Sequence, residues 1–157
     1  MSRTYRIKSV QVMPVTLEQA WKFFSDPNNL QHITPPGMGF TVKSEAHGDR
    51  IYPGQVIEYS LKPMLGIKVY WMTEITHVKE NSFFVDEQRF GPYSLWHHQH
   101  HFKAIPGGVE MTDIVHYRIP LGWLGDLANN LFVRRKLDKL FAYRADVISP
   151  MLILGPQ

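Results

Sequence analysis

The chain has no cysteine among its 157 residues. This absence excludes disulfide bonds, thiol nucleophiles and cysteine metal ligands, and it leaves no sign of an oxidising compartment. No apolar run reaches the ~18 residues that a membrane-spanning helix needs, and the first ten residues hold no apolar stretch of signal-peptide length. We therefore expect a cytoplasmic protein with no integral membrane segment.

The motifs that announce common cofactors and catalytic centres are also missing. The sequence contains no phosphate-binding loop, no glycine-rich dinucleotide fingerprint, no GxSxG elbow and no HExxH zinc motif. Without cysteine, a nucleophile would have to be serine or threonine, and neither stands in a recognisable triad pattern. We therefore expect no cofactor.

Charge of one sign is not concentrated along the chain. Lysine and arginine number 17 against 14 aspartates and glutamates, a net charge of +3. The one dense basic cluster is Arg134, Arg135 and Lys136, and such a triplet on a helix is typical of a solvated face rather than a nucleic-acid site. We therefore expect no nucleic-acid partner, and nothing in the pattern indicates an oligomeric state.

Aromatic residues, in contrast, are abundant at 13% of the chain. A chain of this length is typical of a single domain, here residues 1–157, and it can bury a full core without disulfides. A small domain so rich in aromatic side chains either packs a dense core or lines an apolar pocket.

The apolar periodicity predicts an α+β fold. Alternation of period two predicts a first strand over residues 5–13 and six further strands between residues 39 and 120. A capping-box pattern from Thr16 to Gln19 predicts a short helix, and Asp26-Pro27 predicts a second one over residues 28–33. Helical periodicity predicts a long helix from Leu127 to about Leu152, after a glycine-containing connector over residues 121–126. An antiparallel sheet of about seven strands needs a cover for its apolar face, and this helix is the only large one.

One strand, GPYSLWHHQHHF over residues 91–102, carries two different faces. Trp96, His98, His100 and Phe102 share one face, and a two-residue turn at Gly107-Gly108 would place His98 opposite Tyr117 in the next strand. The face with His97, Gln99 and His101 then meets more polar partners. We therefore expect the first set to face the long helix, although a one-residue slip would reverse the faces.

The two inward histidines admit three interpretations: ligands of a metal, structural residues held by hydrogen bonds, or residues that contact a ligand without a metal. Their spacing suits two ligands of one zinc ion, with Asp86, Asp113 or Gln88 as the third ligand. Buried histidines are more often held by hydrogen bonds to a neighbour such as Asp86 or to water. We favour the second interpretation and expect no metal.

Asp86 and Gln88 are predicted to face inward from the preceding strand, together with Phe84 and Phe90. A buried carboxylate is costly unless it is paired, and its pKa shifts. Asp86 is therefore either a general base beside His98 or Tyr117, or a structural hydrogen-bond partner.

Other inward positions combine flat rings with polar ends. Arg144, on the helix, either meets a ligand carboxylate or extends to the rim of the pocket. The residues that we expect to contact a ligand are Tyr59, Trp71, Thr73, Asp86, Gln88, Trp96, His98, His100, Tyr117, Phe141 and Arg144.

Five segments of the sequence resemble a known superfamily. They read FFSDPNNLQHITPP (23–36), WMTEI (71–75), FVDEQRFGPYSLWHHQHHF (84–102), MTDIVHYRIPLG (111–122) and FAYR (141–144). With the element order, they resemble the START-related helix-grip (SRPBCC) superfamily, which includes the birch pollen allergen, and within it a bacterial polyketide cyclase/dehydrase-like subfamily. The resemblance implies a curved sheet that grips the long helix, with a cavity between them for hydrophobic molecules.

Three functions follow as hypotheses. The first is binding of a small hydrophobic or aromatic molecule, such as a lipid, polyketide or quinone-like compound. The second is a cofactor-free cyclase, dehydratase or hydrolase that uses His98 or Asp86 as acid and base, with Tyr117 as a further candidate. The third is a protein-interaction module whose cavity is filled by side chains.

Overall fold

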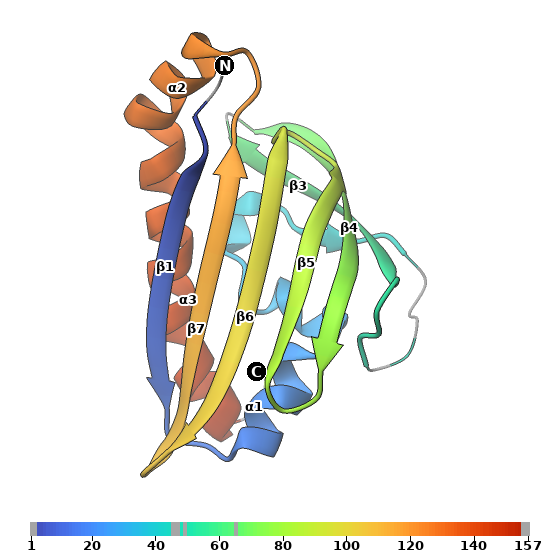
Figure 1. The fold of residues 1–157 in the computed structure, drawn as a ribbon, viewed down its shortest axis with the longest axis vertical. Helices are drawn as coiled ribbons and strands as arrows, with labels where there is room; N and C mark the ends of the chain where they lie inside the picture. The colour runs from blue at the N-terminus through green and yellow to red at the C-terminus, as the bar shows by residue number, and fades with distance from the viewer. Residues whose placement is uncertain (1–2, 45–47, 49, 65, 155–157) are drawn as a thin grey trace.

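The computed structural model describes residues 3–44, 48, 50–64 and 66–154. Its strands are β1 Tyr5–Met13, β2 Thr41–Val42, β3 Val56–Met64, β4 Ile67–Lys79, β5 Phe83–Phe90, β6 Leu95–Ile105 and β7 Gly108–Arg118. They form one seven-stranded sheet in the order β1-β7-β6-β5-β4-β3-β2 (Figure 1). Every neighbouring pair is antiparallel, so the predicted α+β helix-grip architecture is confirmed. Of the strand predicted over residues 39–46, only β2 is strand, and residues 45 and 46 lie outside the described part.

Short helical segments follow β1, as predicted. Helix α1, Leu17–Phe24, begins with the capping box, in which Thr16 and Gln19 each accept from the other's backbone N–H. The second segment, η1 Pro27–Gln31, is a 3₁₀ helix that starts one residue earlier than predicted, because Asp26 caps it by accepting from the Asn28 N–H. A further 3₁₀ turn, η2 Pro36–Met38, was not predicted.

The C-terminal helical segment begins earlier than the sequence suggested. It runs through α2 Trp123–Ala128, a π-helical turn η3 Asn129–Val133, and α3 Arg134–Leu154. The predicted connector over residues 121–126 is therefore wrong from Trp123 onward, because Leu121 and Gly122 alone make the turn, at φ 73° and 57°. Among the described residues, no helix combines the length and the hydrophobicity that a membrane crossing requires.

The register between β6 and β7 differs from the prediction by two residues. Ile105 pairs with Gly108, so the turn residues are Pro106 and Gly107, and His98 lies opposite Val115 rather than Tyr117. A shift of two preserves the face of every side chain, because side chains alternate with period two. Trp96, His98, His100 and Phe102 are accordingly buried, with exposed fractions of 8, 4, 8 and 6%.

Apolar packing on the inner face divides into two main clusters. Phe102 packs with Trp21, Phe84 and other residues around α1 and the end of α3. Trp96 packs with residues at the start of α3, including Phe141. His98 and His100 lie between these two residues on β6, so the polar part of the strand falls between the two apolar clusters.

Gly108 shows why the turn is not where the sequence placed it. A Cβ atom at this position would collide with the backbone oxygen of Met13, because β1 and β7 pack closely here. We expect Gly108→Ala to lower the free energy of unfolding by about 1–3 kcal/mol, the usual cost of overpacking. Urea denaturation measures this, with Gly37→Ala as the control, since a Cβ at Gly37 meets nothing within 4 Å. Equal losses in the two variants would contradict the explanation.

Candidate functional site

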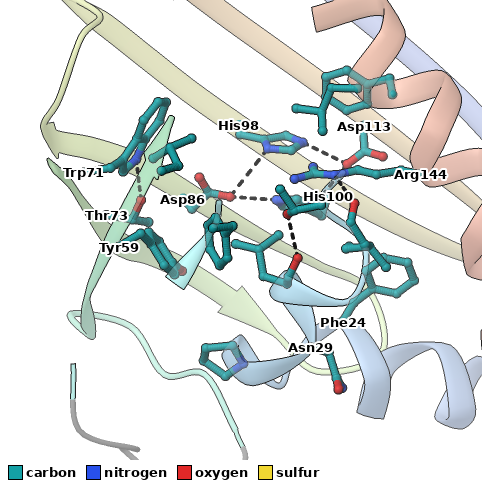
Figure 2. Close-up of a pocket in the computed structure, with 18 of the residues that line it drawn as sticks. Phe24, Asn29, Tyr59, Trp71, Thr73, Asp86, His98, His100, Asp113 and Arg144 are labelled. Carbon is teal, nitrogen blue, oxygen red and sulfur yellow. Dashed lines mark hydrogen bonds and ion pairs between the residues drawn. The ribbon is translucent and has the colours of Figure 1, made fainter. Parts of the chain in front are cut away.

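A cavity of about 390 Å³ lies between the concave face of the sheet, α3 and the segment containing η1 and η2. Its walls are mainly apolar. They include Phe24 from α1, Leu30 from η1, Tyr59 and Trp71 from neighbouring strands, and Phe141 from α3 (Figure 2). Polar side chains from β5, β6, β7 and α3 converge at one part of the wall.

Most of the residues expected to contact a ligand line this cavity. They are Tyr59, Trp71, Thr73, Asp86, Trp96, His98, His100, Phe141 and Arg144. Trp71 and Trp96 meet edge to face with ring centroids 5.3 Å apart. The indole N–H of Trp71 donates to the Thr73 hydroxyl over 2.9 Å, so this pair is held in place without a ligand.

Two of the expected residues lie elsewhere, which corrects the prediction. The Gln88 side chain donates to the backbone oxygen of Tyr93 and accepts from its N–H, so it braces the β5–β6 turn. A register irregularity in β4 beside Thr73 alters this end of β5, where Phe90 is 61% exposed instead of inward. Tyr117 is fully buried and donates to the Asn129 side chain at the helix turn, outside the cavity lining.

Asp113 is the site residue that the list of ligand contacts omitted. The register shift places it directly opposite His100. Its signal in the sequence is the inward row of β7, where Met111, Val115 and Tyr117 are apolar or aromatic and Asp113 alone is charged. The cavity wall from α1, η1 and η2 was also missed, because the 3₁₀ segments are too short for a period and the apolar side of α1 does not by itself indicate a cavity.

Asp86, His98, His100 and Asp113 form what we call the polar quartet (Figure 2). Nε2 of His98 lies 2.8 Å from Oδ1 of Asp113, and Nε2 of His100 lies 2.7 Å from Oδ2 of Asp86. Nδ1 of His100 is 2.9 Å from Oδ1 of Asp113 but lacks hydrogen-bond geometry. Nδ1 of His98 is 3.7 Å from Oδ2 of Asp86. The two carboxylates and two imidazoles therefore alternate.

Burial and mutual charge give the two histidines different protonation states. Burial would lower the pKa of His100, but the close contact with Asp113, the hydrogen bond to Asp86 and the charges of both carboxylates raise it to about 9. Burial lowers the pKa of His98, and the nearby charge of His100 adds to this effect, against the attraction of the two carboxylates. At pH 7 we expect His100 to be an imidazolium and His98 a neutral ring that donates through Nε2, since an ionised carboxylate can only accept.

The carboxylates are ionised for the complementary reason. Burial would raise the pKa of both, but the histidines outweigh it. For Asp113 the close contact of His100 and the hydrogen bond from His98 hold the pKa below its usual range. For Asp86 the charge of His98 and the hydrogen bond and charge of His100 hold the pKa below its usual range.

Arg144 completes the charge balance of the site. Its guanidinium lies beside the quartet, where two carboxylates, one imidazolium and one guanidinium balance (Figure 2). Within the described part of the chain it forms no ion pair, and its one hydrogen bond is a 3.4 Å contact from Nε to the Ile33 carbonyl. Burial lowers its pKa, although the charges of Asp113 and Asp86 oppose this. The terminal nitrogens of Arg144 therefore have donors left for another group.

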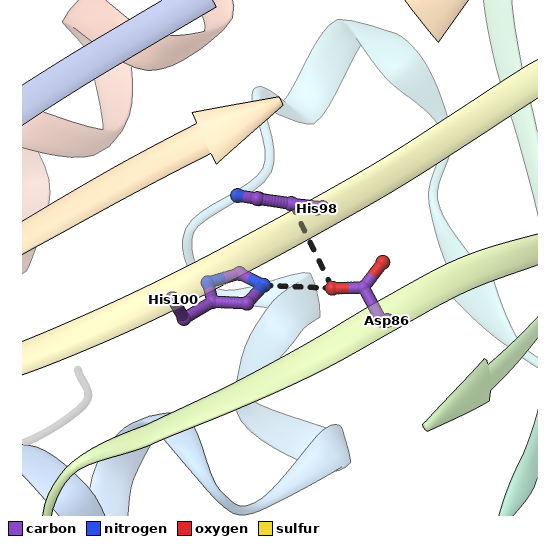
Figure 3. A group of neighbouring side chains, drawn as sticks. All are labelled: Asp86, His98 and His100. Carbon is purple, nitrogen blue, oxygen red and sulfur yellow. Dashed lines mark hydrogen bonds and ion pairs between the residues drawn. The ribbon is translucent and has the colours of Figure 1, made fainter. Parts of the chain in front are cut away.

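Asp86, His98 and His100 have the composition of a metal site, with ligand atoms within 4.8 Å of one another (Figure 3). Asp86 and Nε2 of His100 are already engaged with each other, and His98 is held by Asp113 through Nε2. The Arg144 guanidinium, which interacts with both carboxylates, would also repel a metal cation. The arrangement fits a hydrogen-bonded polar group better than a metal centre, and the absence of a metal stays a prediction.

Comparison with solved structures agrees with the fold. A protein from Thermus thermophilus is similar at a TM-score of 0.74 and 14% identity, covering 98% of this chain and 100% of that chain. The Zhui aromatase/cyclase from Streptomyces sp. R1128 has a TM-score of 0.73 and 10% identity, covering 96% and 94%. A point mutant of norcoclaurine synthase from Thalictrum flavum, in complex with a transition-state analogue, has a TM-score of 0.68 and 14% identity, covering 98% and 96%. These likenesses show that the chain has the helix-grip fold.

The other two comparisons gave no match. No family model matches the chain, and no curated protein sequence is significantly similar to it.

The raised pKa of His100 predicts a pH-dependent stability. The folded protein holds a proton that the unfolded chain releases near pH 6.5, so this stabilisation is complete below pH 6.5 and is lost as the pH rises through about 9. We expect the free energy of unfolding to fall by about 3 kcal/mol across this window. Urea denaturation between pH 6.5 and 9.5 should show this fall in the wild type and in His97→Gln, whose side chain is on the outer face. A fall of the same size in His100→Gln would contradict the assignment.

Proposed function

We propose that this protein binds a small, largely hydrophobic molecule with a flat aromatic part and one oxygen acceptor, in the cavity between sheet and helix. Aromatic polyketides and quinone-like compounds have this character, and a lipid shares its hydrophobicity and its oxygen acceptor. The observation that carries the proposal is that apolar and aromatic walls converge on Arg144, whose terminal nitrogens make no hydrogen bond to any described residue.

The size and lining of the cavity support this proposal over a filled core. Ligand pockets are typically about 300–1,000 Å³, mostly apolar, with a few polar groups that orient the ligand. The cavity here is about 390 Å³ and has the polar quartet and Arg144 on one wall. A protein-interaction module with a plugged cavity would have closed this space with side chains.

The aromatic walls favour a flat ligand. Trp71 and Trp96 are perpendicular, with an interplanar angle of 88°, and both line the cavity. Tyr59 on the neighbouring strand also lines it, and its ring packs on Phe40 with centroids 5.0 Å apart. Ring faces and edges fixed in this way stack against a planar molecule at little entropic cost.

Arg144 supplies the polar recognition. A guanidinium with free donors binds a carboxylate, phenolate or carbonyl oxygen, and such a charge-assisted hydrogen bond is stronger in a low-dielectric cavity than in water. The quartet beside it holds two carboxylates and one imidazolium, and the guanidinium balances the remaining negative charge.

A probe pair tests the role of Arg144. The dyes 1-anilinonaphthalene-8-sulfonate and N-phenyl-1-naphthylamine share one aromatic skeleton, and only the first has an anionic group. We expect Arg144→Met to weaken fluorescence-detected binding of the sulfonate about tenfold or more, the usual value of a charged hydrogen bond, and to leave the neutral dye within about twofold. Arg144→Lys should lie between.

The exposed lysine of β6 supplies the control. Lys103→Gln removes a cation far from the cavity lining and should leave the binding of both dyes unchanged. The proposed mode of binding is wrong if neither dye binds the wild type, or if a fatty acid or a quinone does not displace the dyes. It is also wrong if Arg144→Met weakens the binding of both dyes equally.

A second candidate function is acid–base catalysis without a cofactor. The observation that favours it is the His98–Asp113 hydrogen bond, which orients a neutral imidazole at the cavity wall with its other nitrogen free to accept a proton. Two of the structural neighbours are named as enzymes, a synthase and an aromatase/cyclase. A cyclase or dehydratase of this kind would use His98 as base, with Asp86 close to it.

Native mass spectrometry distinguishes the binder from the enzyme. We expect the protein purified from its own host to carry the same small molecule in the wild type and in His98→Gln if it only binds. If the protein is a cyclase or dehydratase, His98→Gln should carry the unconverted substrate. This compound is heavier than the product by the mass of one water molecule. His97→Gln, on the outer face of β6, controls for the loss of a histidine from this strand.

A further inference from the structure

Six large apolar side chains are exposed along one short segment at the start of the C-terminal helix. Each is between 48 and 77% exposed. We call them the apolar surface: Leu121, Trp123, Leu124, Leu127, Leu131 and Phe132. Exposed apolar groups that are contiguous in this way mark an interaction site more often than chance exposure does.

The fold leaves this segment uncovered. In Figure 1, α2 stands beyond the end of the sheet where the N-terminus lies, so no strand crosses its outer side. Trp123, Leu127 and Leu131 are four residues apart and share that side of the helix. Its inner side packs closely at Gly125, where an added Cβ would collide with the backbone oxygen of Pro120. Asn129 on the same side accepts a hydrogen bond from the Tyr117 hydroxyl.

Two backbone features also single out the segment. Leu121 has φ 73°, a left-handed conformation that a leucine rarely adopts, and its side chain is 77% exposed. The π-helical turn η3 lies between α2 and α3, and π turns occur frequently at functional sites. Leu121 is not among the residues that line the cavity.

Cations follow directly on the apolar surface. Between residues 118 and 139 the chain carries Arg118, Arg134, Arg135, Lys136 and Lys139, against Asp126 and Asp138. Arg135 is exposed, whereas Arg134 pairs with Asp138 and Arg118 donates to the Thr4 hydroxyl. Lys136 and Lys139 line the cavity, and Asp126 accepts from the Tyr5 hydroxyl. An apolar, tryptophan-containing helix face flanked by arginine and lysine matches an anionic lipid surface, with rings at the interface and cations at the phosphates.

We propose that the apolar surface and the cations beside it dock this protein on anionic lipid membranes. Val133, next to Phe132, and Lys136 both line the cavity, so docking would bring the cavity close to the bilayer. The proposal stands on the surface alone and does not require any particular ligand. A symmetric dimer through the same surface is disfavoured, because it would bring the cations of one copy toward those of the other.

Vesicle binding tests the proposal with the full-length protein. Co-sedimentation with phosphatidylcholine vesicles containing about one third phosphatidylglycerol should be strong, and binding to pure phosphatidylcholine at least tenfold weaker. The emission of Trp123, taken as the difference between wild type and Trp123→Phe, should shift to the blue on binding. Raising the salt from about 0.05 to 0.5 M should release the protein, because salt screens the cations.

Matched variants separate the two parts of the surface. Trp123→Gln combined with Leu124→Gln should weaken vesicle binding at least tenfold, since two apolar side chains lose their burial. Arg135→Gln should weaken it about fivefold. The controls are Phe90→Gln, an exposed apolar residue at the end of β5, and Lys103→Gln on β6, and both should bind as the wild type does.

Three results would overturn the proposal. The first is equal binding to neutral and anionic vesicles, or none to either. The second is binding that Phe90→Gln or Lys103→Gln reduces as much as the surface variants do. The third is a wild-type dimer in analytical ultracentrifugation that Trp123→Gln/Leu124→Gln dissociates, which would assign the surface to a second copy of the chain. Circular dichroism confirms that each variant is folded, which is expected because the substituted side chains are exposed.

Discussion

The arrangement of the site depends on how the charges of the polar quartet are paired. Its members, Asp86, His98, His100 and Asp113, are largely withdrawn from water in the middle of the concave face of the sheet. A single buried carboxylate or imidazolium would be strongly unfavourable there. Alternation of two carboxylates with two imidazoles, closed by contacts of 2.7–2.9 Å, offsets this cost. Removing one member leaves the others unpaired, so the four residues act as a unit.

This unit explains why a cavity remains at the centre of the molecule. The apolar clusters around Phe102 and Trp96 each pack tightly, but the polar residues between them present hydrogen-bonding groups that an apolar helix face cannot satisfy. Arg144 from α3 lies beside them (Figure 2). The Arg144 guanidinium is buried beside balanced charges and still has free N–H donors, and this makes the cavity a candidate binding site.

The C-terminal segment connects this interior to the surface. Tyr117 ties β7 to the π turn through Asn129, α3 continues from that turn along the cavity wall, and α2 precedes it with its apolar side uncovered. A ligand cavity and a membrane-facing surface on one continuous helical segment are compatible with exchange of a poorly soluble molecule between bilayer and protein. The two proposals remain independent, because the surface is defined by exposed residues and the cavity by buried ones.

The sequence by itself determined the element order, the antiparallel sheet and the inward face of β6. Period-two alternation is a local property, and it assigned Trp96, His98, His100 and Phe102 to the inside even though the predicted register was two residues out. The capping box of Thr16 and Gln19 is equally local and was correctly predicted. The long helix was recognised by its period, but its start was not, because two positive-φ residues at Leu121 and Gly122 replaced the expected connector.

Only the tertiary structure decided which atoms meet. The pairing of β6 with β7 placed Asp113, rather than Val115, opposite His100, and β1 packs closely on β7 at Gly108. Where the pairing of β4 with β5 is irregular, Phe90 faces outward and the Gln88 side chain bonds the backbone of Tyr93. The Tyr117 hydroxyl bonds Asn129 in the π turn instead of facing the cavity. These outcomes depend on contacts between residues far apart in the chain, and neither period nor spacing encodes such contacts.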